Sequence, residues 1–355
     1  MFRDINHHVI YTDAAFKQFG DKHGYLLAQV PYHRSGRFLC SFWAGNIPEW
    51  RGKYSSLWFK KNLFGEFSSV YAFVYSTECM KYAHWVAKKR KIPLVVHLAD
   101  HSPEFERTPS AKILHSASKL VCITEEMKSM YEQTLGRNDI EVLHNGAEET
   151  CSEIPPIKVE TFSEQKPFVM CFIGSLFSQL HGDCIEDLFE AVSQIRKKSP
   201  WIEFHLYGQR QPAHFLEDSI HSDGCKHHGI VMPLERKFKI MEKAHCFVIP
   251  SSFNNQKHLH YRFSFPTKLP ELIASGRPIL SYGPKETATN RILHAHNIGL
   301  RIHERSVSKL VENLENMGSQ YKESTKKFAT ACPSILKNFS ADCVRRKLKN
   351  ILLSK

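Results

Sequence analysis

Two side chains suited to ligand chemistry, Lys268 and Glu271, lie three residues apart in the stretch 261–278, YRFSFPTKLPELIASGRP. Strand-like runs flank this stretch, so it predicts a loop and a short helix between two strands, with Thr267 as the helix N-cap. An ammonium and a carboxylate beside the free N–H groups of a helix start suit a phosphate with a sugar hydroxyl next to it. An ordinary crossover with a solvated Lys and Glu fits the same residues equally well.

The composition bounds the class of protein. A chain of 355 residues is long enough for two domains, and 42% hydrophobic with 24% charged residues is typical of a globular protein. No apolar run approaches a membrane span and residues 1–10 lack a signal-peptide core, so we expect a cytoplasmic protein. The ten cysteines form no C-x-x-C pair and no metal-ligand spacing, so we expect reduced thiols and no structural metal.

The formal charge of +12 is concentrated at the end of the chain, where residues 321–355 hold nine basic and two acidic side chains. Such a tail allows peripheral contact with the anionic inner face of a membrane, at about 1 kcal/mol per basic residue. Val344, Leu348 and Ile351 recur at helical spacing. This favours the alternative of a packed C-terminal helix whose basic face is exposed to solvent. Aromatic residues do not interleave with the basic ones, so we expect no specific nucleic-acid binding.

Strand and helix patterns alternate regularly from about residue 68. They predict a βαβαβ parallel sheet before residue 150 and a six-stranded doubly wound unit, with a helix near 213–221, after residue 167. A strand-like run at 37–43 precedes the regular part. The expected organisation is an N-terminal domain over 1–150, a polar, proline-bearing linker over 151–166, a second domain over 167–320 and a basic helical segment over 321–355.

Glycines follow several predicted strands, where open α/β sheets bind their ligands. Gly174 in FIGSL and Gly208 in HLYGQR let the backbone approach a ligand closely, and His181-Gly182 is expected to open a helix that begins near residue 183. Each glycine alone is more often a turn, but together with the cluster at 268–271 they favour a ligand crevice. No dinucleotide fingerprint, P-loop or serine nucleophile elbow follows any strand.

The second half resembles the C-terminal domain of a GT-B glycosyltransferase, similar to the bacterial family 4 (glycosyl transferase group 1) enzymes. The similarity rests on FIGSL with HG, LYG, HHGIVMPLERKFKIMEKAHCFVIPSS and FSFPTKLPELIASGRPIL, and in the first half on IPLVVHLAD, KLVCITEEMKSMYEQTLG and IEVLHNGAE. It implies an α/β protein with two Rossmann-like doubly wound domains facing across a cleft, and a closing helix that returns to the N-domain. It also implies transfer of a sugar from a nucleoside-diphosphate-sugar to a saccharide or lipid-linked acceptor, as in polysaccharide biosynthesis, with retention, no cofactor and often no metal.

The resemblance also assigns site residues. Glu271 matches the glutamate expected to accept hydrogen bonds from the ribose hydroxyls, 264–267 matches the diphosphate and sugar loop, and 229–232 matches the turn on which the base rests. The resemblance and the strand ends together predict a donor site of Glu271, Lys268, Thr267, Pro266, Phe265, Ser264, Arg262, Gly174, Ser175, His181, Gly182, Gly208, Arg210, Gly229 and Val231.

Several positions depart from the family pattern. Phe263 stands where a first glutamate is often found, and Ser175 and His181 stand where a basic pair neutralises the diphosphate. Lys268, Arg210 or Arg262 is expected to supply that charge, because an uncompensated diphosphate is a poor leaving group. These departures keep open a second interpretation, a GT-B-like nucleotide- or sugar-binding scaffold without catalysis.

The first half of the sequence offers only weak catalytic candidates. The family's N-terminal strand and glycine-rich loop have no counterpart before Tyr25, so the start is either shortened or divergent. Asp100 and His101 follow a predicted strand and are suited to position an acceptor hydroxyl or the donor sugar. A role in packing or capping fits them equally well.

Overall fold

The computed structural model describes residues 9–11, 27–29, 69–74, 77–147, 154, 161–208, 210–211, 223–231, 234–254 and 258–353. The expected strand at 37–43, the helix at 213–221 and most of the linker at 151–166 lie outside the described residues. The chain divides into two compact units, Met1–Val142 with Arg345–Lys355 and Leu143–Val344. The division therefore falls at residue 142, and the C-terminal segment contributes to both units.

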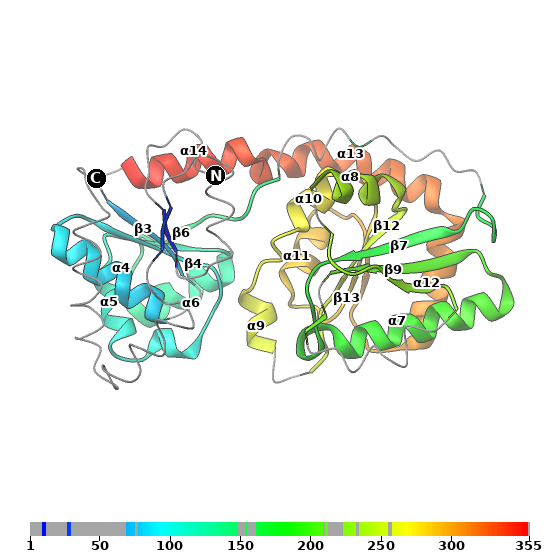
Figure 1. The fold of residues 1–355 in the computed structure, drawn as a ribbon, viewed down its shortest axis with the longest axis horizontal. Coiled ribbons are helices and arrows are strands. Elements are labelled where there is room, and N and C mark those ends of the chain that lie inside the picture. Colours follow the sequence, from blue (N-terminus) through cyan, green and yellow to red (C-terminus); the bar gives the residue numbers. More distant parts are fainter. Residues whose placement is uncertain are drawn as a thin grey trace. The chain divides into compact units, whose positions relative to one another are not determined.

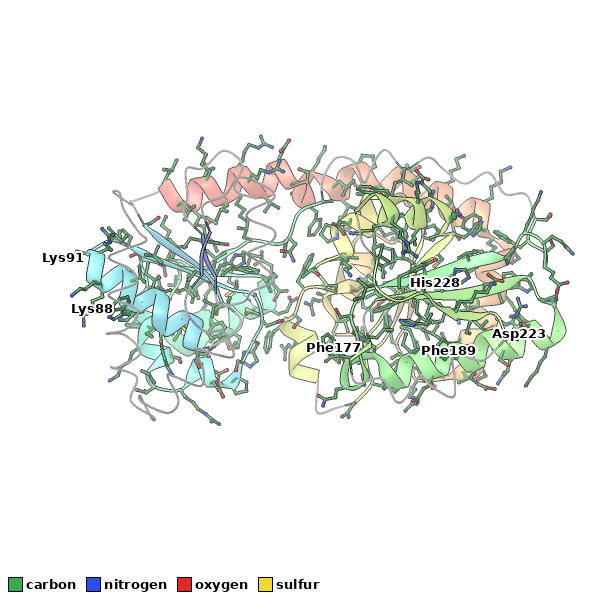
Figure 2. All side chains as sticks on the ribbon, viewed as in Figure 1. Lys88, Lys91, Phe177, Phe189, Asp223 and His228 are labelled. Carbon is green, nitrogen blue, oxygen red and sulfur yellow. The ribbon has the colours of Figure 1, made fainter. Side chains whose placement is uncertain are left out.

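The first unit contains a parallel sheet of four strands in sequence order. The strands are β3 (Val70–Val74), β4 (Leu94–Leu98), β5 (Lys119–Cys122) and β6 (Glu141–Val142). They alternate with α4 (Thr77–Arg90), the 3-10 helix η1 (Pro103–Glu106), α5 (Ser110–Ser116) and α6 (Glu125–Leu135), and β1 (Val9–Tyr11) pairs separately with β2 (Leu27–Gln29). Lys88 and Lys91, labelled in Figure 2, lie at the basic end of α4. The βαβ alternation expected from the sequence is confirmed.

The second unit contains the predicted six-stranded parallel sheet (Figure 1). Its strands are β7 (Phe168–Ile173), β9 (Ile202–Tyr207), β11 (Cys225–His227), β12 (Cys246–Pro250), β13 (Ile279–Tyr282) and β14 (Leu300–Ile302). Their spatial order is β11-β9-β7-β12-β13-β14, so the chain builds outward in one direction from β7 and then in the other from β12. The topological switch point, where doubly wound sheets bind ligands, lies between β7 and β12.

Helices cover both faces of this sheet, as expected for a doubly wound unit. The helices of this unit are α7 (Ser178–Lys198), α8 (Leu234–Lys243), α9 (His258–Phe263), α10 (Leu269–Ala274), α11 (Ala288–Ala295), α12 (Val307–Ser319) and α13 (Tyr321–Phe339), and α14 (Ala341–Leu353) follows them, with most of its residues in the first unit. Two local expectations are wrong. Helix α7 begins at Ser178 and not near residue 183, and the N-cap of α10 is Lys268 and not Thr267.

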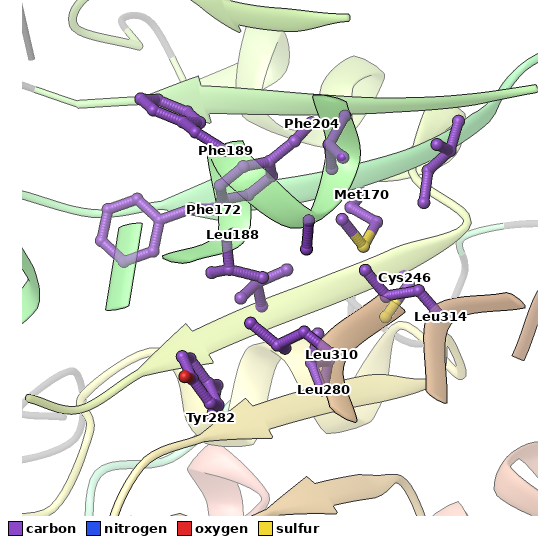
Figure 3. Packing of buried hydrophobic residues seen from close by; sticks show 14 of the residues in the cluster. Met170, Phe172, Leu188, Phe189, Phe204, Cys246, Leu280, Tyr282, Leu310 and Leu314 are labelled. Carbon is purple, nitrogen blue, oxygen red and sulfur yellow. The ribbon is translucent and has the colours of Figure 1, made fainter. Parts of the chain in front are cut away.

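A large core of the second unit lies between the sheet and one pair of helices (Figure 3). Leu188 of α7, Leu310 and Leu314 of α12, and Met170 and Phe204 of the sheet belong to one buried cluster. Because residues from both helices enter the same cluster, α7 and α12 pack side by side on one face. This packing holds α7 against the sheet, next to the loop that leaves β7.

The C-terminal segment forms the packed helix that its periodicity favoured. In α14, Leu348 is fully buried and Ile351 is 1% exposed. A parallel bridge joins Ala147 to Ser340, and a Cβ on Gly146 would lie 2.8 Å from the Cα of Ala341, so only glycine allows this close approach. Among the described residues, no helix combines the length and apolarity needed to cross a membrane.

Candidate functional site

The switch point of the second unit brings two of the predicted loops together. The short strand β8 (Leu176–Phe177), directly after Ser175, pairs in parallel with β10 (Arg210–Gln211), directly beyond β9. The loops that leave β7 and β9 therefore run side by side at the carboxyl edge of the sheet. The backbone of Arg210 lies in this pairing, whereas its side chain is outside the described residues.

Three of the predicted glycines lie next to one another at this edge. The N–H of Gly208 donates to the carbonyl of Gly229 at 2.8 Å, and the N–H of Gly174 donates to the carbonyl of Tyr207 at 2.8 Å. A Cβ on Gly208 would lie 1.5 Å from the carbonyl oxygen of Gly174, which no side chain can tolerate. Glycine at 208 is therefore required by the packing of two backbone segments, whatever ligand binds above them.

Lys268 and Glu271 lie together at the beginning of α10, and a third charged residue joins them. Lys237 of α8 forms an ion pair with Glu271, although the two residues are 34 positions apart. The side chain of Lys237 is only 14% exposed and that of Glu271 is 25% exposed. We call Lys237, Lys268 and Glu271 the α10 cluster.

The α10 cluster has two cations and one anion in a half-buried setting. Burial lowers the pKa of Lys268, the neighbouring charge of Lys237 lowers it further, and Glu271 opposes the shift. Lys237 and Lys268 therefore repel each other, and with the single carboxylate of Glu271 the cluster keeps a net positive charge. A diphosphate placed here would relieve this repulsion, because it supplies the missing negative charge.

In the segment 262–267, which covers the end of α9 and the loop before α10, the two aromatic residues are buried. Phe263 is 5% exposed and Phe265 is 4% exposed. The ring of Phe265 stacks on His144 at 4.7 Å between centroids, so its side chain is a packing residue. Arg262 and Thr267 are exposed, whereas Ser264 and Pro266 are half-buried. The position expected to carry a glutamate in the family is thus filled by a buried phenylalanine.

Ser175 and His181, the residues at the positions of the family's basic pair, lie in surroundings that differ from the expectation. Ser175 is exposed, Gly182 is buried, and the half-buried His181 packs edge-on against Phe172 at 5.5 Å. Because α7 begins at Ser178, the N–H groups of His181 and Gly182 fall beyond the first turn, where helix geometry directs them to carbonyls of the same helix. The expectation that this pair opens the helix is therefore wrong.

The turn expected to hold the base follows β11. Gly229 has φ +72°, a conformation that favours glycine, and a Cβ there would meet nothing within 4 Å. Val231 is half-buried two residues further on. Just before the turn, His228 (labelled in Figure 2) stacks on Tyr207 with centroids 4.5 Å apart and rings 11° from parallel.

Asp100 and His101 lie in the first unit, directly after β4. Asp100 is half-buried, and the Nε2 of His101 lies 3.6 Å from a carboxylate oxygen of Glu106. The ring of His101 also packs near that of Tyr131, with the two centroids 6.3 Å apart. These contacts are compatible with packing and with acceptor positioning, so both interpretations stay predictions. In the described part of the chain, no group of three or more His, Cys, Asp or Glu gathers as metal ligands would.

One site residue escaped the sequence-based prediction. Lys237 lies in the run LERKFKIMEK, where it is one of several basic residues on an amphipathic helix. Nothing in the local pattern distinguishes it from Lys239 or Lys243. Only the packing of α8 beside α10 identifies it as the partner of Glu271.

A doubly wound domain with a cationic cluster at its ligand edge, in one chain with a second parallel unit, is the arrangement of GT-B glycosyltransferases. The family model "Glycosyl transferases group 1" matches residues 167–319. The second unit is therefore similar to this family over those residues, and the expected resemblance is confirmed. No curated protein sequence matches the chain.

Solved structures show the fold of the whole chain. HepE of Anabaena, solved with UDP-glucose, superposes with a TM-score of 0.70 at 14% identity, over 96% of this chain and 89% of that one. A glycosyltransferase of Rickettsia africae gives 0.65 at 12% identity, over 97% and 88%. The lipopolysaccharide outer core galactosyltransferase WaaB gives 0.59 at 16% identity, over 92% and 84%. The chain has the GT-B fold, as expected.

Proposed function

We propose that this protein is a glycosyltransferase that moves a sugar from a nucleoside-diphosphate-sugar to a saccharide or lipid-linked acceptor, with retention at the anomeric carbon. The observation that carries the proposal is the α10 cluster, which lies within the residues similar to glycosyl transferases group 1. Its two ammonium groups and one carboxylate are the groups that a diphosphate joined to a ribose requires. No cofactor beyond the donor is needed for this assignment.

Each residue of the α10 cluster has a role in this proposal. Lys268 and Lys237 neutralise the diphosphate, whose negative charge grows as the bond to the sugar breaks. Glu271 accepts hydrogen bonds from the ribose hydroxyls, and its ion pair with Lys237 holds the carboxylate in place. The positive charge supplied here compensates for the absence of basic side chains at Ser175 and His181.

The ligands and activities of similar structures suggest the first donors and acceptors to test. HepE was solved with UDP-glucose and with UDP, and WaaB is described as a lipopolysaccharide galactosyltransferase. We therefore infer a UDP-sugar donor and a saccharide or lipid-linked acceptor of polysaccharide biosynthesis. We also infer a cytoplasmic protein whose basic C-terminal residues allow peripheral contact with an anionic membrane.

The test is a turnover assay on the full chain. UDP release is measured with UDP-glucose, UDP-galactose and UDP-N-acetylglucosamine, each with and without saccharide acceptors. We expect acceptor-dependent turnover with at least one donor, and a loss in kcat/KM of roughly 100-fold in Lys268→Ala, because a charged contact to the leaving group is removed. Saturable UDP binding without turnover on any donor would favour the non-catalytic scaffold instead.

A further inference from the structure

The second unit carries a pocket that the α10 cluster does not use. Its volume is 410 Å³, which falls in the range of about 300–1,000 Å³ found for small-molecule sites. Among the described residues, six line it, namely Gln179, Asp183, Ser252, Phe253, Asn254 and Arg305. They come from the first turns of α7, the loop after β12 and the segment after β14, and we call this the α7 pocket.

The residues of the α7 pocket differ from those assigned to the diphosphate. Gln179 and Asp183 are four residues apart on α7, so they project from one face of the helix near its beginning, where Figure 2 labels Phe177. His181 projects from the opposite face, where it packs against Phe172. None of the six lining residues belongs to the α10 cluster.

The two charged side chains of the α7 pocket, Asp183 and Arg305, are held in place by the protein itself. Asp183 accepts the backbone N–H of Phe253 at 2.9 Å and that of Cys184 at 3.0 Å. Arg305 donates from Nε and Nη2 to the two carboxylate oxygens of Asp187, at 2.9 and 3.1 Å. Asp187 also accepts the hydroxyl of Tyr282 at 2.8 Å. A ligand would therefore meet side chains that are already ordered, which lowers the entropic cost of binding.

The charge of the α7 pocket argues against an anion. Asp183 and Asp187 carry two negative charges against the single positive charge of Arg305, so a phosphate would be repelled. The remaining N–H groups of Arg305, the amides of Gln179 and Asn254, and the hydroxyl of Ser252 include both donors and acceptors. Phe253 adds an apolar surface. A neutral ligand rich in hydroxyls, with an apolar face for the ring, has the matching chemistry.

We propose that the α7 pocket binds one neutral pyranose unit of a saccharide, apart from the nucleotide-sugar donor. The side chain of Arg305 is 51% exposed, so the pocket opens to solvent and a longer glycan can extend from it. In a glycosyltransferase such a site holds the acceptor or product chain near the enzyme. This role rests on the proposed function, whereas the binding of the sugar does not.

The experiment is a titration of the full chain with the methyl glycosides of glucose, galactose and N-acetylglucosamine, followed by saturation-transfer NMR. We expect at least one to bind, and Gln179→Ala to weaken it about fivefold through one lost hydrogen bond. Arg305→Lys, which keeps the charge beside Asp187, should also weaken binding. Glu190→Ala, about two turns further along α7 and outside the pocket, is the matched control and should leave binding unchanged.

Three outcomes would overturn the proposal. The first is that none of the three glycosides binds saturably. The second is that Gln179→Ala and Arg305→Lys leave binding unchanged. The third is that Glu271→Ala abolishes binding whereas Gln179→Ala does not. A parallel UDP titration separates this inference from the proposed function. Unchanged UDP affinity with no glycoside binding would refute the α7 pocket alone, whereas absent UDP binding would refute the donor site.

Discussion

The imidazole of His245 makes the second unit sensitive to mild acid. This residue directly precedes β12, and its Nδ1 accepts the backbone N–H of Val169 at 2.9 Å. The ring is 8% exposed and stacks on Phe168 at 5.6 Å between centroids. Burial, and to a lesser extent the charge of Arg277, lowers the pKa of His245 to about 4. Protonation would also place a hydrogen on the nitrogen that now accepts from Val169.

The sign and size of the effect follow from this shift. Between about pH 6.5 and 4 the unfolded chain binds a proton that the folded chain does not, so folding becomes less favourable as the pH falls through this window. Above pH 6.5 the residue contributes no pH dependence. At pH 5 the loss in the free energy of unfolding is about 2 kcal/mol, since each pKa unit corresponds to about 1.4 kcal/mol.

The assay compares the wild type with His245→Asn, whose amide oxygen can replace Nδ1 as acceptor but does not titrate. Urea unfolding at pH 7 and pH 5 is followed by the fluorescence of Trp201, in a background where the other four tryptophans, all in the first unit, are phenylalanine. Other histidines titrate in both proteins and cancel in the difference. We expect the wild type to lose about 2 kcal/mol more than the variant, and equal losses would refute the reasoning.

Three further predictions concern the ligand edge and the core. Wild type should bind UDP about tenfold better than 2′-deoxy-UDP, and Glu271→Ala should bind both equally by calorimetry, because the carboxylate accepts from the ribose hydroxyls. Gly208→Ala should lower the free energy of unfolding by at least about 3 kcal/mol, because its Cβ would overlap the carbonyl oxygen of Gly174, whereas Gly229→Ala should cost only about 1–2 kcal/mol for its positive φ. Leu188→Ala should cost about 2–5 kcal/mol in the same denaturation assay, since it leaves a cavity in the core between α7 and the sheet.

The sequence predicted those elements whose signal is periodic and local. The strands that became β7, β9, β12 and β13 are apolar runs bounded by turn residues, and their parallel pairing follows from the helices between them. Helix α6 has local signals at both ends, a Thr124 cap that accepts the N–H of Met127 and Gly136 at φ +63°. In these places the local chemistry and the tertiary packing agree.

The failures lie where tertiary contacts decide. Helix α9 was expected to be a loop, but Tyr261 and Phe263 are buried in it and the Tyr261 hydroxyl donates to the carbonyl of Leu180 at 2.6 Å. The early start of α7 follows a strand pairing at Leu176 that no local pattern indicates. Lys237 reaches Glu271 only because α8 packs beside α10. The spacing of residues along the chain does not predict such tertiary contacts.

The central claim is that the α10 cluster binds the diphosphate of the donor. Calorimetric titration with UDP and with uridine tests it most directly, because the two ligands share base and ribose and differ in the diphosphate. We predict that Lys268→Met and Lys237→Met each reduce the preference for UDP over uridine by at least about tenfold, while Lys243→Met, on the exposed end of α8, leaves it unchanged. A preference for UDP that survives in both cluster variants would contradict the claim.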